Sequence, residues 1–196
     1  MKTILLELRM PIKKGPWTVL ETNRIYKNAW VTLDENKVIR PDGKDGIYGI
    51  VTLNCGSTVL PIDSEGNVYL VEQYRFAMEK KTIEAISGGI KPGENPEEAA
   101  IREMREEVGI IAKKLTSLGV IDPLTSAVYG PSNLFIAQDL TIKTANPDGD
   151  ERINIIKVPF AKALEWVNDG TITQSSSVIL ILKVRTLIDE GSIIWK

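Results

Sequence analysis

Three glutamates near the middle of the chain have the residue type and the spacing of a binding site for a divalent cation. Glu103, Glu106 and Glu107 stand at positions i, i+3 and i+4, so on a helix they share one face. Three carboxylates crowded on one face repel each other, and a divalent cation removes that conflict. Carboxylate oxygens suit hard ions, and Mg²⁺ usually takes one or two carboxylates together with phosphate oxygens of a substrate. The pattern therefore predicts a Mg²⁺ site, which Mn²⁺ would also fit.

Composition argues against zinc and leaves one ordinary alternative for the glutamates. Zinc is a poor match because the chain has no histidine and a single cysteine, Cys55. The alternative is that the glutamates form the solvated face of an amphipathic helix, where such spacings contribute only about 0.2–0.5 kcal/mol per pair. That explanation suits any one of them, whereas the whole pattern, with its glycines and capping signals, favours the cation site.

The flanking residues predict a helix from about Pro96 to Val108 that presents these glutamates. Asn95 is a good N-cap, Pro96 suits the first helical position, and Glu98 completes a capping box. Gly109 can adopt the left-handed conformation that ends a helix. The apolar positions that can pack inward are Ala99, Ala100, Met104 and Val108.

The stretch from Gly88 to Ile110 contains every fixed position of the Nudix box. The pattern is Gly88, five residues, Glu94, seven residues, Arg102-Glu103-Met104, one residue, Glu106-Glu107, one residue, Gly109-Ile110. The chain therefore resembles a Nudix hydrolase, a family that cleaves nucleoside diphosphates linked to another group. Nine constrained positions make the match far more specific than a lone glycine-rich loop.

The resemblance assigns roles within the box. Arg102 is placed to pair with a carboxylate and hold it in line, and by resemblance that partner is Glu94. Glu103 and Glu107 would bind the metal directly, and Glu106 would assist. The residues expected at the metal are Ser87, through its carbonyl, Glu103, Glu106 and Glu107.

Other residues are similar to those of the ADP-ribose pyrophosphatase branch of the family. The segment Val71-Glu72-Gln73-Tyr74-Arg75 matches its Val-x-Gln-Tyr/Phe-Arg strand. Glu84 followed by Ser87-Gly88 matches its Glu-x-Pro-Ala-Gly entry, although Ile86 and Ser87 replace the usual Pro-Ala. By resemblance Arg75 contacts the diphosphate, for which the alternative is a surface ion pair. Glu84 would lie at the edge of the site, near the metal or the terminal ribose.

Two aromatic residues and an acidic loop complete the expected site. Trp17 and Tyr48 align with positions that stack the adenine ring in some relatives, although aromatic residues more often pack in cores or interfaces. Relatives also place a glutamate that acts as general base in a loop that here holds Asp148, Asp150 and Glu151. With no histidine in the chain, we expect Glu151 to be the base, with Glu106 as the rival and a merely solvated loop as the alternative.

The substrate expected from this branch is ADP-ribose, hydrolysed to AMP and ribose 5-phosphate. The segment 122–131 lacks the glycine and the acidic residue that ADP-ribose-specific members carry there. A nucleotide sugar such as GDP-mannose, or a dinucleotide, is therefore an alternative substrate. A further alternative is a nucleotide-binding module that has lost turnover. An RNA 5′-pyrophosphohydrolase would need a basic channel, and the net charge of −2 argues against this and against general nucleic-acid binding.

The elements that must position these residues alternate as in an α/β/α sandwich with a mixed sheet. Strands are expected at 17–21, 25–33, 38–40, 46–53, 57–62, 68–74, 114–121, 132–139 and 152–158. Helices are expected at 96–108, 160–167 and 175–189. The last of these contains an apolar run that periodicity cannot distinguish from a strand, and the family pattern favours a helix. Residues 1–45 are predicted to form an N-terminal β subdomain and residues 46–196 the Nudix domain. In this branch such a subdomain swaps across a homodimer and helps to build the substrate site.

Composition sets wider bounds. With 196 residues, 43% hydrophobic and 26% charged, the chain can form one good core. One cysteine precludes an internal disulfide and fits a reducing compartment. The apolar run at the N-terminus is interrupted by Glu7 and Arg9, so we expect no signal peptide. No segment approaches the ~20 apolar residues of a membrane span. We therefore expect a cytoplasmic protein.

Overall fold

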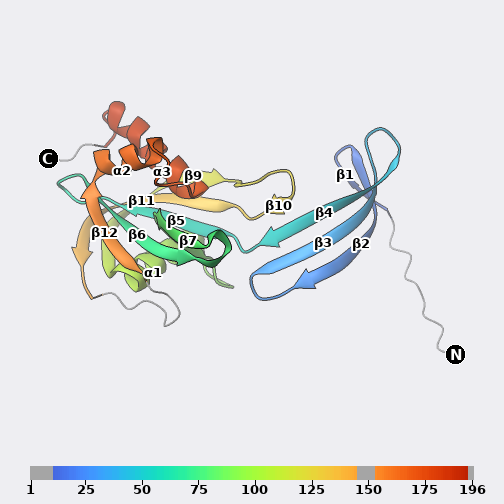
Figure 1. Cartoon of the computed structure of the whole chain (residues 1–196), viewed down its shortest axis with the longest axis horizontal. Coiled ribbons are helices and arrows are strands. Elements are labelled where there is room, and N and C mark those ends of the chain that lie inside the picture. Colours follow the sequence, from blue (N-terminus) through green and yellow to red (C-terminus); the bar gives the residue numbers. More distant parts are fainter. Residues whose placement is uncertain (1–10, 145–152, 194–196) are drawn as a thin grey trace. The chain divides into compact units, whose positions relative to one another are not determined.

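The computed structural model describes residues 11–144 and 153–193, which belong to two units (Figure 1). The N-terminal unit contains the chain up to Asn54 together with Leu124–Gly130. The C-terminal unit contains Cys55–Pro123 and the chain from Pro131 onward. Among the described residues, no helix is long and apolar enough to cross a membrane.

The N-terminal unit is a five-stranded sheet in the order β1-β2-β3-β4-β10. Strands β1 to β4 pair antiparallel, and β10 pairs parallel to β4. Its strands are β1 (Ile12–Lys14), β2 (Trp17–Lys27), β3 (Val31–Ile39), β4 (Asp45–Leu53) and β10 (Val128–Tyr129). Among the described residues of this unit, only Val19, Asn36 and Val38 are buried. The expected strand 46–53 is present as β4, and its residues are half-buried or exposed rather than part of a core.

The predicted strand 25–33 is also wrong, because it contains a turn. The side-chain carbonyl of Asn28 accepts hydrogen bonds from the backbone N–H groups of Trp30 and Val31, at 2.8 and 2.7 Å. An Asn side chain that binds the backbone two residues on offers the chain an alternative to the ladder of a sheet. The apolar residues on either side of Asn28 thus belong to two strands, β2 and β3.

The C-terminal unit contains two sheets between helices. One has the order β8-β5-β11-β9, in which β5 and β11 are parallel and the other pairs antiparallel, so it is mixed. The other has the order β12-β6-β7 and is antiparallel. The strands are β5 (Gly56–Pro61), β6 (Asn67–Arg75), β7 (Lys80–Glu84), β8 (Ile86–Gly89), β9 (Ile110–Ile121), β11 (Ser132–Ile142) and β12 (Asn154–Pro159). The helices are η1 (Phe76–Met78), α1 (Pro96–Val108), α2 (Phe160–Asn168) and α3 (Ser175–Asp189).

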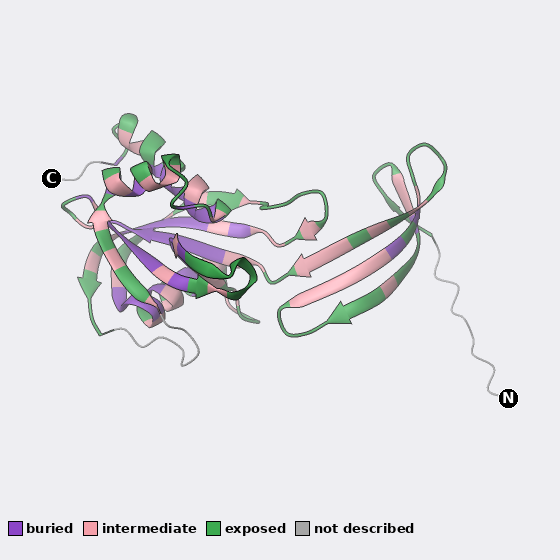
Figure 2. Cartoon of the chain, viewed as in Figure 1, coloured by how far each residue is buried: buried purple, intermediate pink, exposed green. Residues whose placement is uncertain are grey.

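Two apolar clusters show that the strands are covered on both faces. Val59 and Val71 pack with Met104 of α1 in one cluster. Their strand neighbours Leu60 and Leu70 belong to the other cluster, which contains buried residues of α2 and α3. Adjacent strand residues point to opposite faces, so α1 lies on one side and α2 and α3 on the other. Figure 2 shows the buried residues concentrated along these strands. The predicted α/β/α sandwich with a mixed sheet is confirmed.

Helix α1 begins and ends where local signals predicted. The Asn95 side chain accepts a hydrogen bond from the Glu98 backbone N–H, and the Glu98 carboxylate accepts one from the Asn95 N–H, both at 2.9 Å. Gly109 ends the helix with φ of 66°, a conformation that suits glycine. These caps satisfy backbone groups at both ends of the helix, so the glutamates of α1 stand on a well-defined element.

Candidate active site

Strand alternation places part of the candidate site on the α1 side of the C-terminal unit. Tyr69 and Val71 of β6 belong to the same apolar cluster as Met104 of α1. Alternate residues of a strand point to the same face. Gln73 and Arg75, two and four residues beyond Val71, therefore also lie on the α1 side of the sheet.

The register between β6 and β7 brings further polar residues to this face. Val71 pairs with Glu84, and Gln73 pairs with Thr82. Directly paired residues of antiparallel strands share a face. Thr82 and Glu84 thus join Gln73 and Arg75 on the side of the sheet that α1 covers.

Glu103 of α1 packs directly against Gly88 of β8. A Cβ atom added to Gly88 would lie 1.9 Å from Oε1 and 2.1 Å from Cδ of Glu103. A side chain at this position would have to displace the Glu103 carboxylate, so the glycine leaves the space that this carboxylate occupies. Ser87, the residue whose carbonyl was predicted as a ligand, precedes Gly88 in β8. The predicted metal residues Ser87 and Glu103 thus come from adjoining elements.

Arg102 is paired with three carboxylates. Its Nε and Nη2 donate to the two oxygens of Glu94 at 2.8 and 3.0 Å. Its Nη1 donates to Glu103 at 2.6 Å and to Glu106 at 3.2 Å, and Nη2 also donates to the Gly89 carbonyl at 2.9 Å. The guanidinium therefore ties the loop before α1, the end of β8 and the helix face to one another.

This pairing shifts the pKa values of both partners. Hydrogen bonds from Arg102 lower the pKa of the Glu94 carboxyl to about 2, against the partial opposition of burial. The Glu94 carboxylate in turn raises the pKa of the Arg102 guanidinium, and Glu103 and Glu106 add to the effect. Both groups stay ionised throughout the physiological pH range.

The predicted metal ligands, Ser87, Glu103, Glu106 and Glu107, suit a hard cation in their chemistry and in the space around them. Their donor atoms are oxygens, and the gap left by Gly88 lets the Glu103 carboxylate lie against the strand that carries Ser87. Glu107, one turn beyond Glu103, is only 4% exposed. No three Asp, Glu, Cys or His side chains converge as a metal-binding group in the described part of the chain. Arg102 is paired with Glu103 and Glu106. The residues fit the predicted ion in type, and Arg102 determines how two of them point.

Arg75 and Glu84, both predicted at the substrate, are bound to each other. Nε and Nη2 of Arg75 donate to the two oxygens of Glu84 at 3.0 and 2.6 Å. The Thr82 hydroxyl donates to Oε1 of Glu84 at 2.6 Å. Burial raises the pKa of the Glu84 carboxyl, but the hydrogen bonds from Arg75 and Thr82 outweigh it, so the net shift is downward. Glu84 is therefore an ionised, buried carboxylate that fixes the orientation of the Arg75 guanidinium.

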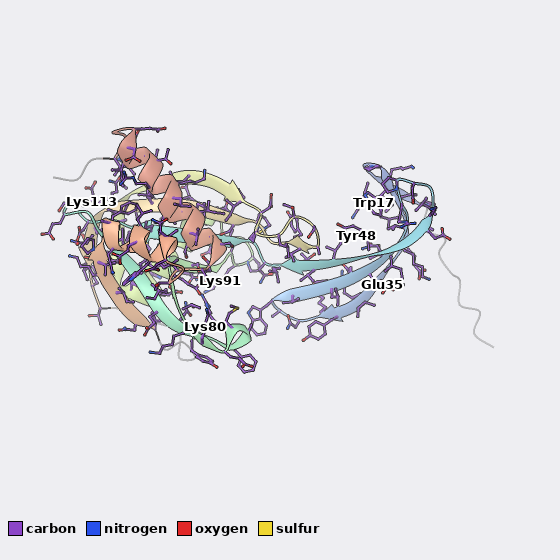
Figure 3. The ribbon with its side chains drawn as sticks, turned by 45° about the horizontal axis from the view of Figure 1, so that its top comes forward. Trp17, Glu35, Tyr48, Lys80, Lys91 and Lys113 are labelled. Carbon is purple, nitrogen blue, oxygen red and sulfur yellow. The ribbon has the colours of Figure 1, made fainter. Side chains whose placement is uncertain are left out.

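Trp17 and Tyr48 meet on one face of the N-terminal sheet (Figure 3). Their ring centroids are 5.3 Å apart and their planes cross at 76°, an edge-to-face contact. The Tyr48 hydroxyl donates to the carbonyl of Ser126. The two rings line a cavity of about 170 Å³ together with Lys14, Val19, Asn36, Val38 and Ile50.

The remaining predicted site residue falls outside this geometry. Glu151, the expected base, lies with Asp148 and Asp150 outside the described residues. A cavity of about 650 Å³ on the α2 and α3 side, lined by residues such as Phe160, Leu164 and Ile188, holds none of the predicted site residues.

Sequence reasoning missed Thr82, which donates a hydrogen bond to Glu84. Its position two residues before Glu84 was the available signal, since such residues share a face of a strand.

Comparison with known proteins places the chain among nucleotide-processing families. Residues 55–168 match the model of the NUDIX domain, and residues 17–51 match that of the nucleoside diphosphate sugar hydrolase N-terminal domain. A methanol dehydrogenase activator from Bacillus methanolicus is 30% identical over 166 residues, which cover 83% of this chain and 89% of the relative.

Two further relatives are named for nucleotide substrates. An ADP-ribose pyrophosphatase from Bacillus subtilis (strain 168) is 28% identical over 160 residues, covering 81% of this chain and 86% of the relative. A crystal structure of an ADP compounds hydrolase superposes with a TM-score of 0.78, covering 95% of this chain and 98% of that one. Its sequence is 23% identical, so this likeness concerns the fold.

Proposed function

The chain belongs to the NUDIX domain family and is a hydrolase of nucleoside diphosphate derivatives, and from this premise we propose that it cleaves ADP-ribose to AMP and ribose 5-phosphate with Mg²⁺. The observation that carries the proposal is the ordered set of carboxylates around Arg102 on α1, next to Gly88. The names of the relatives from Bacillus subtilis and of the ADP compounds hydrolase NudE from Escherichia coli support an ADP-containing substrate.

The proposed Mg²⁺ would be held by the Ser87 carbonyl, Glu103 and Glu107, with Glu106 assisting. A bound divalent cation lowers the pKa of an attacking water and neutralises the charge that develops on the phosphate in the transition state. The chain's own contribution is orientation. Arg102 holds Glu103 and Glu106 from one side, while its bidentate pair with Glu94 prevents the guanidinium from turning away.

For the proton of the attacking water we propose Glu151 as the base, with Glu106 as the alternative. Glu106 accepts a 3.2 Å hydrogen bond from Arg102 and its side chain is 27% exposed, so water can reach its carboxylate. The role of Glu151 rests on the family resemblance. Replacement of each by Gln distinguishes them, because only the loss of the base should remove the acidic limb of the pH–rate profile.

Arg75 is proposed to bind the diphosphate of the substrate. A guanidinium that is already fixed by a bidentate carboxylate loses little side-chain entropy when it binds an anion. The side chain of Arg75 is 38% exposed while that of Glu84 is 3% exposed. A ligand would therefore contact Arg75, and the buried Glu84 would hold the guanidinium in place. Contact of Glu84 with the metal or with the terminal ribose is the alternative role.

The N-terminal unit is proposed to supply the base-binding part of the site in a homodimer. Trp17 and Tyr48 line a cavity of about 170 Å³ and would take the adenine ring. The match of residues 17–51 to the N-terminal domain of nucleoside diphosphate sugar hydrolases supports a role in nucleotide binding. Nucleotide sugars and dinucleotides are the alternative substrates, because the segment 122–131 lacks the glycine and the acidic residue expected for ADP-ribose specificity.

A substrate panel tests the proposal. The wild-type chain is incubated with Mg²⁺ and ADP-ribose, GDP-mannose, other nucleotide sugars or dinucleotides, and release of the nucleoside monophosphate is measured. ADP-ribose should give the highest kcat/KM. Glu103→Gln and Glu107→Gln should each lower turnover on the order of a hundred-fold or more, while the exposed Glu97→Gln on the same helix serves as the matched control. Tight ADP-ribose binding without AMP release would instead indicate a non-catalytic nucleotide-binding module.

A further inference from the structure

Gln73 is a buried polar residue on the same face as Arg75 and Glu84. It is 8% exposed and lies in β6 between Val71, which packs in the α1-side cluster, and Arg75. Residues two apart on a strand are about 6.6 Å apart along its axis. The Gln73 amide therefore lies within the span of a small ligand that also reaches Arg75.

The neighbouring polar groups do not satisfy this amide. The residue directly across from Gln73 is Thr82, whose hydroxyl proton is donated to Glu84. The Nε and Nη2 donors of Arg75 are likewise bound to Glu84. Within residues 11–144 and 153–193 the Gln73 side chain makes no hydrogen bond. The amide nitrogen and oxygen are not among the fully buried side-chain atoms without a partner in the described residues, so they keep contact with solvent and the two N–H donors are available to a ligand.

We propose that Gln73 is a substrate-contacting residue that donates from Nε2 to an oxygen of the diphosphate beside Arg75. The inference rests on the proposed function and adds a residue to it. The Arg75–Glu84 pair is neutral as a unit, so an anionic ligand approaching it also experiences the buried carboxylate. A neutral amide supplies two N–H donors to the anion without any further charge to bury.

The test compares steady-state kinetics of Gln73→Met with the wild type, on the panel compound that the wild type hydrolyses best. Methionine keeps the volume of the side chain and removes both donors. We expect KM to rise roughly ten-fold or more, as for loss of a hydrogen bond to a charged group, and kcat to change by less than about three-fold. The matched control is Gln138→Met in β11. Gln138 follows Ile136 of the α2 and α3 cluster on the opposite face, and its replacement should leave KM unchanged.

A second variant and a binding measurement distinguish a failure of this inference from a failure of the proposed function. Gln73→Glu keeps the shape and polarity of the side chain but adds a carboxylate beside Glu84, so KM should rise further than in Gln73→Met. The dissociation constant for ADP, measured by titration calorimetry, should rise by a similar factor without any turnover. A wild type that releases no monophosphate from any panel compound would overturn the proposed function. An active wild type whose KM and ADP affinity are unchanged in both Gln73 variants would overturn this inference alone.

Discussion

Arg102 illustrates how one side chain can organise a group of like charges. Without it, Glu94, Glu103 and Glu106 would repel each other, and their orientations would depend on solvent. With it, Glu94 accepts hydrogen bonds from Nε and Nη2, while Glu103 and Glu106 share the Nη1 donor. A lysine has the same charge but lacks the planar arrangement of donors, so Arg102→Lys would not reproduce the geometry.

The Glu94–Arg102 pair leads to a prediction about stability and pH. The pKa of the Glu94 carboxyl falls from 4.5 to about 2 on folding, so its contribution to stability is fully present above pH 4.5 and is lost as the pH falls through 2. Glu94→Gln should lower the free energy of unfolding at pH 7 by about 1 kcal/mol, allowing for screening by solvent. Urea unfolding at pH 7, 5 and 3 should show this difference shrinking only between pH 4.5 and 2. A difference that does not depend on pH would contradict the assignment.

At the residue scale, the types of the site residues were predictable but some of their partners were not. The resemblance to the Nudix box identified Glu94 as the partner of Arg102, because the box fixes both positions. The bond from Arg75 to Glu84 depends instead on the cross-strand register of β6 and β7, which no local pattern specifies. The same register places Thr82 and Gln73 opposite each other, and neither was identified as a site residue from the sequence.

At the scale of elements, α1 was predicted to the residue because its signals are local. Its N-cap, its proline at the first position and its C-terminal glycine act within a single turn. Strands β7 and β8 were missed because each is short, and β8 contains two glycines, which are depleted in strands. The prediction of helix α3 is confirmed. Its apolar run, which also suits a strand, is explained by the packing of this helix against both β5 and β11.

The capping box of α1 gives a prediction at this scale. Asn95→Ala removes the acceptor for the Glu98 N–H and should lower the free energy of unfolding by about 0.5–2 kcal/mol, measured by urea denaturation. Asn95→Ser, which retains a capping oxygen, should stay close to the wild type. Equal stability of the alanine variant and the wild type would mean that the cap observed here contributes nothing in solution.

For the whole molecule, the alternation of strands and helices was sufficient to predict the fold class, but the extent of the N-terminal unit was not predictable. The sequence suggested a subdomain that ends at residue 45, and that domain assignment stays a prediction. The structure groups β4 with β1 to β3 and adds Leu124–Gly130. The added segment forms only a two-residue strand, and its pairing with β4 joins residues far apart in the chain.

The proposed homodimer predicts complementation between two defective chains. If Glu103 of one chain and Trp17 of the other build one site, a mixture of Glu103→Gln and Trp17→Ala should regain activity. Half of randomly mixed dimers would contain both chains, each with one intact site, so roughly a quarter of wild-type turnover is expected. The mixture is refolded together and assayed beside each variant alone. A mixture no more active than the sum of its parts would contradict a site shared between chains.

The strand β10 has a consequence for how such a protein could arise. The carbonyl of Ala127, one residue before β10, accepts a hydrogen bond from the Val51 N–H of β4 at 2.9 Å. Strand β10 nevertheless follows α1 in the chain, within the stretch that otherwise folds as the C-terminal unit. A gene fusion that appended residues 1–54 to an independent hydrolase would therefore lack the last strand of this sheet. Grafting the N-terminal unit onto another hydrolase would therefore require transplanting both pieces.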